Sequence, residues 1–297
     1  MAGLAAELIL VDDGSAEPGT LEMLRRLERE GARLLQPRRN AGPATARNAG
    51  LAAATGAWIG FLDADDLWLP GRLTAVRQLM GQPGINWIGG RHQLFGGASE
   101  AATPPGVAAA LNLPPDAIAD GPALTRCLIA NFWMHLGAML VRRDLLVRAG
   151  GFAPGLYYAE DLLLMTKLSV LSPLHLVDHD SYGWRRAGGG LTGSPRRLGR
   201  DTLAMYRVGA AMPELMPFRR ELRWARYAAL KGLALNNLLA GRRAAALGLA
   251  LEAWALDPRE AGDFIRLLAL WARPLKDVRA GAGRYSGAEI FVRGPAG

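Results

Sequence analysis

Short apolar runs alternate with amphipathic stretches through the first third of the chain, a rhythm typical of an α/β fold with a largely parallel sheet. The runs that predict strands are Glu7–Val11, Ala32–Gln36, Trp58–Leu62, Ile85–Gly89, Gln93–Phe95 and Gly137–Val141. The stretches that predict helices are Leu21–Glu30, Pro43–Ala54, Arg72–Met80, Ala123–Ala130 and Leu162–Leu171. The fold class expected from this order is α/β, with a mostly parallel sheet flanked by helices.

The rest of the pattern divides the chain. Residues 96–120 are rich in Ala, Pro and Gly and predict a long loop or an inserted cap. The stretch from Arg197 to Leu275 has a helical period throughout, and the residues after it have none. We therefore expect a catalytic-type α/β domain over residues 1–195, a helical extension over 196–276 and a flexible tail over 277–297.

Composition excludes some classes of protein. Half of the 297 residues are apolar, so the chain can bury a core and is not disordered. The net charge is +8, and residues 191–297 hold 18 Lys and Arg against 9 Asp and Glu. Because the basic region is separate from the acidic motifs, we expect no nucleic acid partner. The basic helices instead favour a peripheral contact with an anionic membrane surface or an acidic acceptor.

Cysteine usage and hydropathy bear on the compartment. Cys127 is the single cysteine, so no intrachain disulfide can form, and we expect it to be a small buried residue. No basic and apolar leader opens the sequence, and no uninterrupted apolar stretch reaches the ~20 residues of a spanning helix. We expect a cytoplasmic protein that at most touches the inner face of the membrane.

Two polar motifs follow the first two predicted strands. Val11 to Ser15 runs from a strand into an Asp-Gly turn, which places Asp12 and Asp13 at the carboxyl edge of the sheet. An ordinary turn is the alternative, since Asp-Gly turns are common. Asn40 to Gly50 leads into a helix with Arg47 about one turn from its start, where a guanidinium can join a phosphate site. A solvated surface arginine is the alternative there.

The third motif is the most specific. Three carboxylates, Asp63, Asp65 and Asp66, fall within four residues after an apolar strand. They repel one another unless a cation or hydrogen-bond donors neutralise them. Oxygen-rich sites of this kind suit Mg²⁺ or Mn²⁺ held together with substrate phosphates. A solvated acidic turn is the alternative.

Taken together, V-D-D-G-S, N-x-G-x-x-x-A-R-N and F-L-D-A-D-D-x-W-x-P resemble the nucleotide-sugar half of the inverting GT-A glycosyltransferases of family 2 type. The likeness continues with Gly150 to Phe152 and then Glu160-Asp161, which resemble the G-G-F and E-D pairs of the acceptor half. It covers residues 7–195, and four motifs in the same order are more specific than any one of them.

The resemblance implies a role for each matching residue. Asp63 and Asp65 would form the metal-binding D-x-D for Mn²⁺ or Mg²⁺. Asp161 would be the general base that deprotonates the acceptor hydroxyl, with Glu160 beside it, although an acidic first helical turn is the alternative for this pair. The residues implied to bind the nucleotide sugar are Asp12, Asp13, Asn40, Arg47, Asn48 and Asp66.

The sequence departs from the resembled family in two places. The family opens with an apolar strand and a P-x-Y-N-like turn, and here the chain begins at what corresponds to its second strand. We therefore expect Glu7–Val11 and Trp58–Leu62 to lack a common neighbour, each unpaired backbone group costing on the order of 1–3 kcal/mol, and the chain to be poorly stable or prone to associate.

The second departure follows the general base. The family carries a Y-x-Y-R-x-H pattern whose histidine can reach the metal, and the stretch that starts at Tyr182 has no histidine. Arg185 or Arg186 could instead stabilise the diphosphate. The four histidines show no ligand spacing, and we expect each of them to be structural.

The helical extension shows two patterns. Leu233, Ala246, Ala253 and Pro258, with Gly241 between them, resemble one tetratricopeptide-like hairpin, although a plain helical extension is the alternative. Arginines 219, 223 and 226 follow helical spacing and form a basic stripe, which is either a solvated face or a membrane contact.

These patterns favour a metal-assisted transfer of sugar from a nucleotide diphosphate sugar to a glycan, lipid-linked or protein acceptor. The alternative is a non-catalytic nucleotide-binding or scaffold protein derived from such an enzyme. A phosphohydrolase or nucleotidyltransferase is less favoured, because neither explains Glu160-Asp161.

Overall fold

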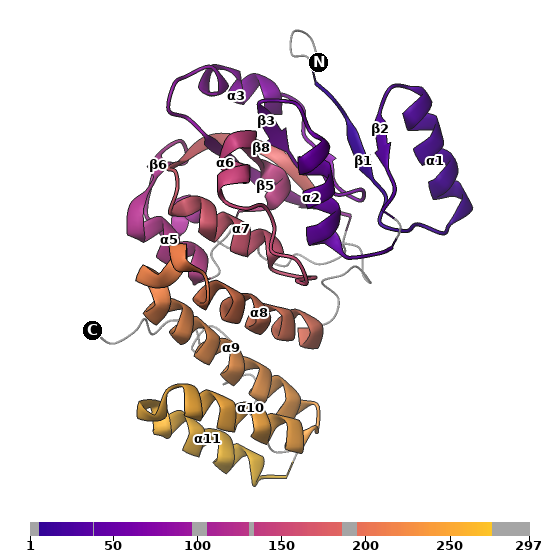
Figure 1. Ribbon diagram of the computed structural model, residues 1–297. Coiled ribbons are helices and arrows are strands. Elements are labelled where there is room, and N and C mark those ends of the chain that lie inside the picture. The colour runs from indigo at the N-terminus through magenta and orange to yellow at the C-terminus, as the bar shows by residue number, and fades with distance from the viewer. Residues whose placement is uncertain (1–5, 38, 97–105, 131–133, 186–194, 275–297) are drawn as a thin grey trace. The chain divides into compact units, whose positions relative to one another are not determined.

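The chain folds as two compact units, residues 1–190 and 191–297, each described by itself (Figure 1). The computed structural model describes residues 6–37, 39–96, 106–130, 134–185 and 195–274.

The first unit opens with a two-stranded parallel sheet. β1 (Ile9–Val11) pairs in parallel with β2 (Arg33–Leu35). The helix α1 (Pro18–Arg29) connects the two strands along the chain. Glu17 caps that helix, because its carboxylate accepts hydrogen bonds from the backbone N–H groups of Gly19 and Thr20. Figure 1 shows these three elements together as a small lobe.

The main sheet is mixed. Its strands follow the order β3, β7, β5, β8, β4, and β6 pairs with β8. These strands are β3 (Trp58–Gly60), β4 (Leu67–Trp68), β5 (Trp87–Phe95), β6 (Ile118–Ala119), β7 (Met139–Arg142) and β8 (Leu174–Arg185). Only β5 and β8 are parallel within it, and the other pairs are antiparallel. The expected α/β class, with helices flanking a sheet, is confirmed, but the sheet is mixed rather than mostly parallel because β7 lies antiparallel between β3 and β5.

The two longest strands differ from the sequence prediction. The predicted strands Ile85–Gly89 and Gln93–Phe95 are one continuous strand, β5, whose register with β8 shifts around Arg91. The long strand β8 was missed. Its middle carries Asp178, His179 and Asp180, which break the apolar alternation that marks a strand.

The helices of the first unit lie between these strands. They are α2 (Pro43–Ala53), α3 (Arg72–Met80), α4 (Val107–Ala110), α5 (Gly121–Ile129), η1 (Leu136–Ala138), α6 (Arg143–Arg148) and α7 (Glu160–Ser169). The stretch 96–120 is not all loop, since α4 and β6 form within its described part. After its first two residues α7 is buried along its whole length, so this helix is a central element of the core.

The first strands bear on the predicted gap. β1 pairs with β2, and β3 pairs with β7. Within the described ranges β1 and β3 do not pair with each other, so the two sheets remain separate. Leu8 is exposed beside this edge.

The second unit is helical over its described part. It contains α8 (Pro195–Ala210), η3 (Pro213–Phe218), α9 (Arg219–Leu239), α10 (Arg243–Leu256), η4 (Pro258–Glu260) and α11 (Ala261–Trp271). The predicted hairpin is present: Gly241, with a φ of +79°, joins α9 to α10, and Ala246 and Ala253 are buried in it. No helix of the described residues is long and apolar enough to cross a membrane.

Of the three arginines in the basic stripe, Arg223 and Arg226 contact α10. Arg223 donates to the carbonyl oxygen of Leu256, and Arg226 pairs with Glu252 at 2.6 Å. Both acceptors lie on α10, so two of the three stripe arginines hold the hairpin together. Arg219 remains exposed.

Candidate active site

The turn after β1 is held by its own carboxylates. Asp12 is buried, and it accepts hydrogen bonds from the Ser15 N–H at 2.8 Å and from Gln36 Nε2 at 3.0 Å. Burial works to raise the pKa of Asp12, but the bonds from Ser15 and Gln36 outweigh it and lower the pKa. Asp12 is therefore an anion that braces the turn.

Asp13 ties this turn to the start of α2. Its two oxygens accept from the backbone N–H groups of Ala41 (3.0 Å) and Gly42 (2.8 Å). Gly42 has a φ of +85°, and a Cβ there would lie 2.9 Å from the ring of Tyr157, so only glycine fits. The side chain of Asn40 is exposed beside Gly14 in the same corner.

Asn48 has a structural role. Its amide donates to the Phe152 carbonyl oxygen at 2.8 Å and accepts from the Phe152 N–H at 2.9 Å. The predicted nucleotide-sugar residue therefore clamps the Gly150–Phe152 turn to α2. A Cβ on Gly151 would lie 2.5 Å from Asn48 Oδ1, so this glycine is required for the close approach.

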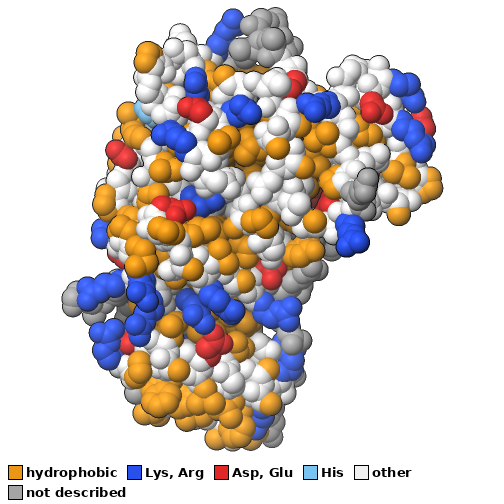
Figure 2. Space-filling model, in the orientation of Figure 1, with side chains coloured by type: hydrophobic (Ala, Val, Ile, Leu, Met, Phe, Trp, Pro, Cys, Tyr) orange, Lys and Arg blue, Asp and Glu red, His pale blue; other side chains and the backbone are white. Residues whose placement is uncertain are grey.

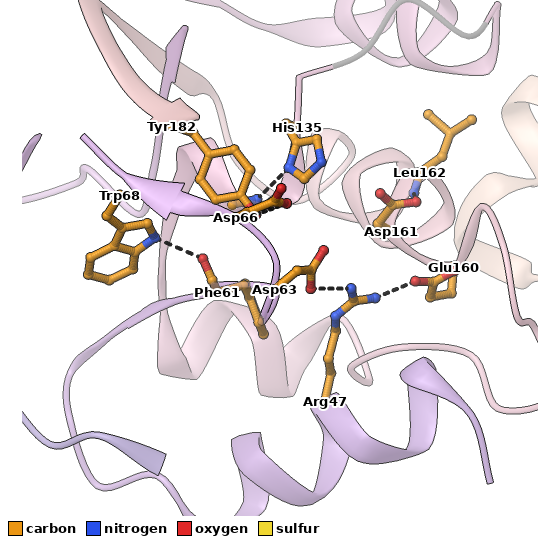
Figure 3. Close-up of polar contacts among 11 residues, drawn as sticks. Arg47, Phe61, Asp63, Asp66, Trp68, His135, Glu160, Asp161, Leu162 and Tyr182 are labelled. Atoms are coloured by element: carbon orange, nitrogen blue, oxygen red, sulfur yellow. Dashed lines mark hydrogen bonds and ion pairs between the residues drawn. The ribbon is translucent and has the colours of Figure 1, made fainter. Parts of the chain in front are cut away.

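Arg47 joins two of the predicted motifs. Its guanidinium donates to Asp63 Oδ1 at 2.8 Å and to Glu160 Oε1 (Figure 3). It also lies over the Phe152 ring. Burial works to lower the pKa of Arg47, but the charges of Asp63 and Glu160 outweigh it and raise the pKa. Arg47 is thus a permanent cation between the two carboxylate motifs.

The three carboxylates after β3 have different surroundings. Asp63 is partly exposed and faces Arg47. Asp66 is buried, and it accepts from the Tyr182 hydroxyl and the Arg185 N–H, each at 2.6 Å. Asp65 is exposed, and its backbone carbonyl accepts from Arg185 Nε at 2.7 Å.

Arg185 therefore holds the acidic loop from within β8. Its backbone bonds Asp66, its guanidinium bonds the Asp65 carbonyl, and it lies 4.9 Å from the centre of the Phe95 ring. The neighbouring Arg186 lies outside the described residues.

A histidine lies beside these carboxylates. Ligand atoms of Asp63, Asp66 and His135 lie within 4.8 Å of one another. His135 stacks on Tyr182 with 4.5 Å between ring centres, and its Nδ1 accepts from the Gly137 N–H at 3.2 Å (Figure 3). Burial lowers the pKa of His135, against the pull of Asp161, Asp63 and Asp66, which favours the neutral imidazole that binds metals.

This group differs from the predicted metal ligands. Two carboxylates and a neutral imidazole form a donor set that Mn²⁺ or Mg²⁺ accepts. Asp63 belongs to the group as predicted, and Asp65 does not, since Asp66 takes its place. His135, which we expected to be structural, supplies the third side chain. Its sequence position gave no ligand spacing, so the signal lies only in the fold.

The acidic pair begins α7. Ala159 precedes the helix with a φ of +59°, which turns the chain sharply into its first turn. Glu160 is buried, and Asp161 is partly exposed. Burial and the charge of Asp161 raise the pKa of Glu160 to about 7, against the pull of Arg47.

Asp161 belongs to the same site as the acidic loop. The negative charge of Asp161 acts to raise the pKa of both Arg47 and His135. Arg47 bonds to Asp63, and His135 lies near it. Figure 3 shows the side chains of Asp161, Glu160 and Asp63 around Arg47. The fold thus brings Asp63, in the loop after β3, close to Asp161, in the first turn of α7, although the two are far apart in the sequence.

Two buried cations were missed by the sequence patterns. Arg72 begins α3, and Lys167 lies inside α7, and their exposed fractions are only 2% and 3%. Arg72 donates to carbonyl oxygens of Gly137, Met139 and Ser181. A charged residue within an amphipathic helix is ordinarily exposed, so sequence alone gave no sign of this burial.

Comparisons with known proteins bear on the family and the fold. Residues 3–118 match the family model described as Glycosyl transferase family 2. The succinoglycan biosynthesis protein ExoO of Rhizobium meliloti (strain 1021) is 44% identical over 71 residues, which is 24% of this chain and 20% of ExoO. ExoU from the same organism is 39% identical over 102 residues, 33% of this chain and 28% of ExoU. The matches span less than a third of these relatives.

Solved structures share the fold over most of the chain. S. aureus TarS 1-349 in complex with UDP-GlcNAc has a TM-score of 0.56 at 17% identity, covering 94% of this chain and 83% of that chain. Mannosyltransferase PcManGT from Pyrobaculum calidifontis, with GDP-Man and Mn²⁺, has a TM-score of 0.51 at 20% identity, covering 96% and 76%. Identities this low establish the fold alone.

Proposed function

We propose that this chain is a GT-A-fold, family 2-like glycosyltransferase, which moves a sugar from a nucleotide diphosphate sugar to an acceptor hydroxyl with inversion of configuration. The observation that carries the proposal is that Asp63, Asp66 and His135 lie together, with Asp161 near enough for its charge to act on His135. A donor-binding group and a base must meet at one anomeric carbon.

In this scheme the donor lies along the turns after β1 and before α2. Asp13, which accepts from the Ala41 N–H, and the exposed Asn40 would border the nucleoside end, and Arg47 would face the diphosphate. Since α2 begins at Pro43, its N-terminal end adds a positive dipole near the phosphates. Arg47 would then exchange part of its bonding to Asp63 for a phosphate oxygen.

Asp63, Asp66 and His135 would hold the divalent cation. When bound, a divalent cation neutralises charge that develops on the departing diphosphate. Tyr182 and Arg185 orient Asp66 through its two oxygens, so its geometry is fixed before the cation arrives. Burial and the bond to Asp66 raise the pKa of Tyr182, which keeps its hydroxyl a donor.

Asp161 would act on the acceptor. Its carboxylate is partly exposed at the start of α7, where an incoming hydroxyl can reach it. It would take the hydroxyl proton as the oxygen attacks the anomeric carbon and the bond to the diphosphate breaks. A single base and no covalent enzyme intermediate give one displacement and therefore inversion.

The test is a binding and transfer experiment. We expect UDP-GlcNAc or GDP-mannose to bind in calorimetry only when Mn²⁺ or Mg²⁺ is present, and a panel of glycan, lipid-linked and protein acceptors to yield an inverted product by NMR. Binding that ignores the cation, or a retained anomeric configuration, would contradict the proposal.

A second candidate has one observation in its favour. Arg47 bonds both Asp63 and Glu160, so a chain in which this bridge never opens would bind nucleotide without turnover. Such a protein would be a scaffold derived from a glycosyltransferase. It would bind donor and show no transfer with any acceptor, and Arg47→Lys would not change that.

We further propose that the second unit touches an anionic membrane surface. Arg219 and Arg220 are exposed, and apolar side chains gather over α10 and α11 (Figure 2). Trp254 and Ile265 are 42% and 63% exposed. We expect the protein to sediment with phosphatidylglycerol vesicles and not with phosphatidylcholine vesicles, and Trp254→Ser with Ile265→Ser to abolish sedimentation.

A further inference from the structure

We propose that Arg72 and Lys167 are positioning residues that separately hold the two halves of the site. Arg72 holds the half that contains Asp66 and His135, and Lys167 holds the half that contains Asp161. The inference rests on the function proposed above and names residues outside its binding and catalytic set.

Arg72 connects four segments from inside the first unit. Its guanidinium donates to the carbonyl oxygens of Gly137, of Met139 at 2.8 Å and of Ser181 at 3.3 Å. It also lies over the Trp68 ring, 4.3 Å from its centre. These contacts join the start of α3 to η1, β7, β8 and β4.

Two of these segments, η1 and β8, support members of the group formed by Asp63, Asp66 and His135. Gly137 donates its N–H to His135, and Ser181 directly precedes Tyr182, which donates to Asp66. The fit leaves no space, since a Cβ on Gly137 would lie 1.9 Å from the Tyr182 ring. A shift of these carbonyls therefore moves the imidazole and the Asp66 carboxylate together.

The chemistry of arginine suits this task better than that of lysine. A planar guanidinium presents five N–H donors in fixed directions, so one group can reach carbonyls on different strands. An ammonium is a compact point charge on a flexible stem. Burial lowers the pKa of Arg72 to about 10, which still leaves it charged at neutral pH.

Lys167 holds the half of the site that contains Asp161. Its Nζ donates to the carbonyl oxygens of Ala149, at 2.7 Å, and of Gly151. That turn holds Gly150 and Gly151 at φ values of +71° and +62° and places Phe152 under Arg47. Because Lys167 is part of α7, these bonds set the position of the helix whose first turn carries Asp161.

The two roles predict separable defects. We would compare Arg72→Met and Lys167→Met with Arg142→Met as the matched control, since Arg142 also lies over a tryptophan, Trp58, but is partly exposed. Thermal unfolding would establish that each variant folds. The readouts are Mn²⁺ affinity by calorimetry with UDP and GDP, donor KM, kcat and acceptor KM.

We expect Arg72→Met to weaken Mn²⁺ binding and raise the donor KM by about 10–100-fold, the usual cost of removing support behind a metal ligand. Lys167→Met should leave Mn²⁺ affinity within about twofold while lowering kcat or raising the acceptor KM about tenfold or more. Arg142→Met should match the wild type. Arg72→Lys should recover folding and only part of the Mn²⁺ affinity.

Several outcomes would overturn the inference. Unchanged Mn²⁺ affinity in Arg72→Met contradicts it, as do parallel losses of every readout in both Met variants, which would indicate a merely structural role. If Arg72→Met does not fold, Arg72→Lys decides, because full Mn²⁺ affinity in that variant also contradicts it. A wild type that binds neither Mn²⁺ nor nucleotide contradicts the proposed function instead.

Discussion

The loop after β3 and the first turn of α7 both present paired carboxylates, yet they control charge in opposite ways. In the loop, Asp63 faces Arg47, and Asp66 receives a hydroxyl and a backbone N–H. At α7, burial and the repulsion from Asp161 raise the pKa of Glu160 to about 7. The Asp66 carboxylate receives two donors, whereas the buried Glu160 carboxylate receives one side-chain donor, from Arg47.

This difference fits two kinds of chemistry. Carboxylates held by hydrogen-bond donors are fixed in position, which suits cation binding. A carboxyl whose pKa lies near neutral can exchange a proton, which suits a site where an acceptor hydroxyl is deprotonated. Arg47 bonds to Asp63 in the loop and to Glu160 at the start of α7, so it couples the two regions.

The largest expected effect separates the two regions by function. Asp161→Asn should lower transfer by about 10²–10⁴-fold, since it removes the base, while nucleotide-sugar affinity stays within about twofold. Parallel kinetics and calorimetry on the wild type and the variant measure both. Equal loss of donor binding in Asp161→Asn would mean that the two regions do not divide the work.

The next effect tests the loop itself. Asp63→Asn and Asp66→Asn should each weaken Mn²⁺-dependent nucleotide binding by about 10–100-fold, whereas Asp65→Asn should weaken it by less than about threefold. The difference follows because Asp65 is exposed and outside the ligand group. Calorimetry with Mn²⁺ and UDP or GDP measures it, and a large loss in Asp65→Asn would restore the predicted D-x-D assignment.

A smaller effect concerns the clamp between the regions. Asn48→Ala removes two bonds to the Phe152 backbone and should lower the free energy of unfolding by about 2–3 kcal/mol. Urea denaturation measures this loss. Asn40→Ala is the control, since Asn40 is exposed, and a loss of similar size there would show that the clamp is not the cause.

The smallest effect is a pH dependence at α7. The folded pKa of Glu160 is raised from 4.5 to about 7, so its protonated form stabilises the fold below pH 4.5, and that contribution is lost as the pH rises through 7. Glu160→Gln should remove a decline of about 1 kcal/mol between pH 5 and 7. Melting temperatures of both proteins across this range measure it, and parallel curves would contradict the raised pKa.

The sequence predicted the parts of this site that local motifs encode. Asp12 and Asp63 follow apolar strands, and Asp161 lies in the first turn of a helix. In each case a regular apolar pattern in the sequence lies directly beside the acidic residue. Because the order of the motifs identified the resembled family, it also identified the fold. The helical hairpin followed from the same reasoning, with Gly241 at its turn.

Other features depend on packing that no local pattern records. The strand β8 was missed because its buried ends flank a polar middle. His135 reaches Asp66 only because η1 and β8 stack it on Tyr182. In the sequence, Arg72 has the pattern of an exposed helical arginine, whereas in the structure it is buried among backbone carbonyl groups.

The most direct test of the central claim is to locate the cation. Crystals grown with Mn²⁺ and a nucleoside diphosphate would show it by anomalous scattering. We predict one peak within ligand distance of Asp63, Asp66 and His135, with the Asp161 carboxylate facing the same space. A peak at Asp65 away from His135, or Asp161 on the opposite face of the sheet from the peak, would contradict the account.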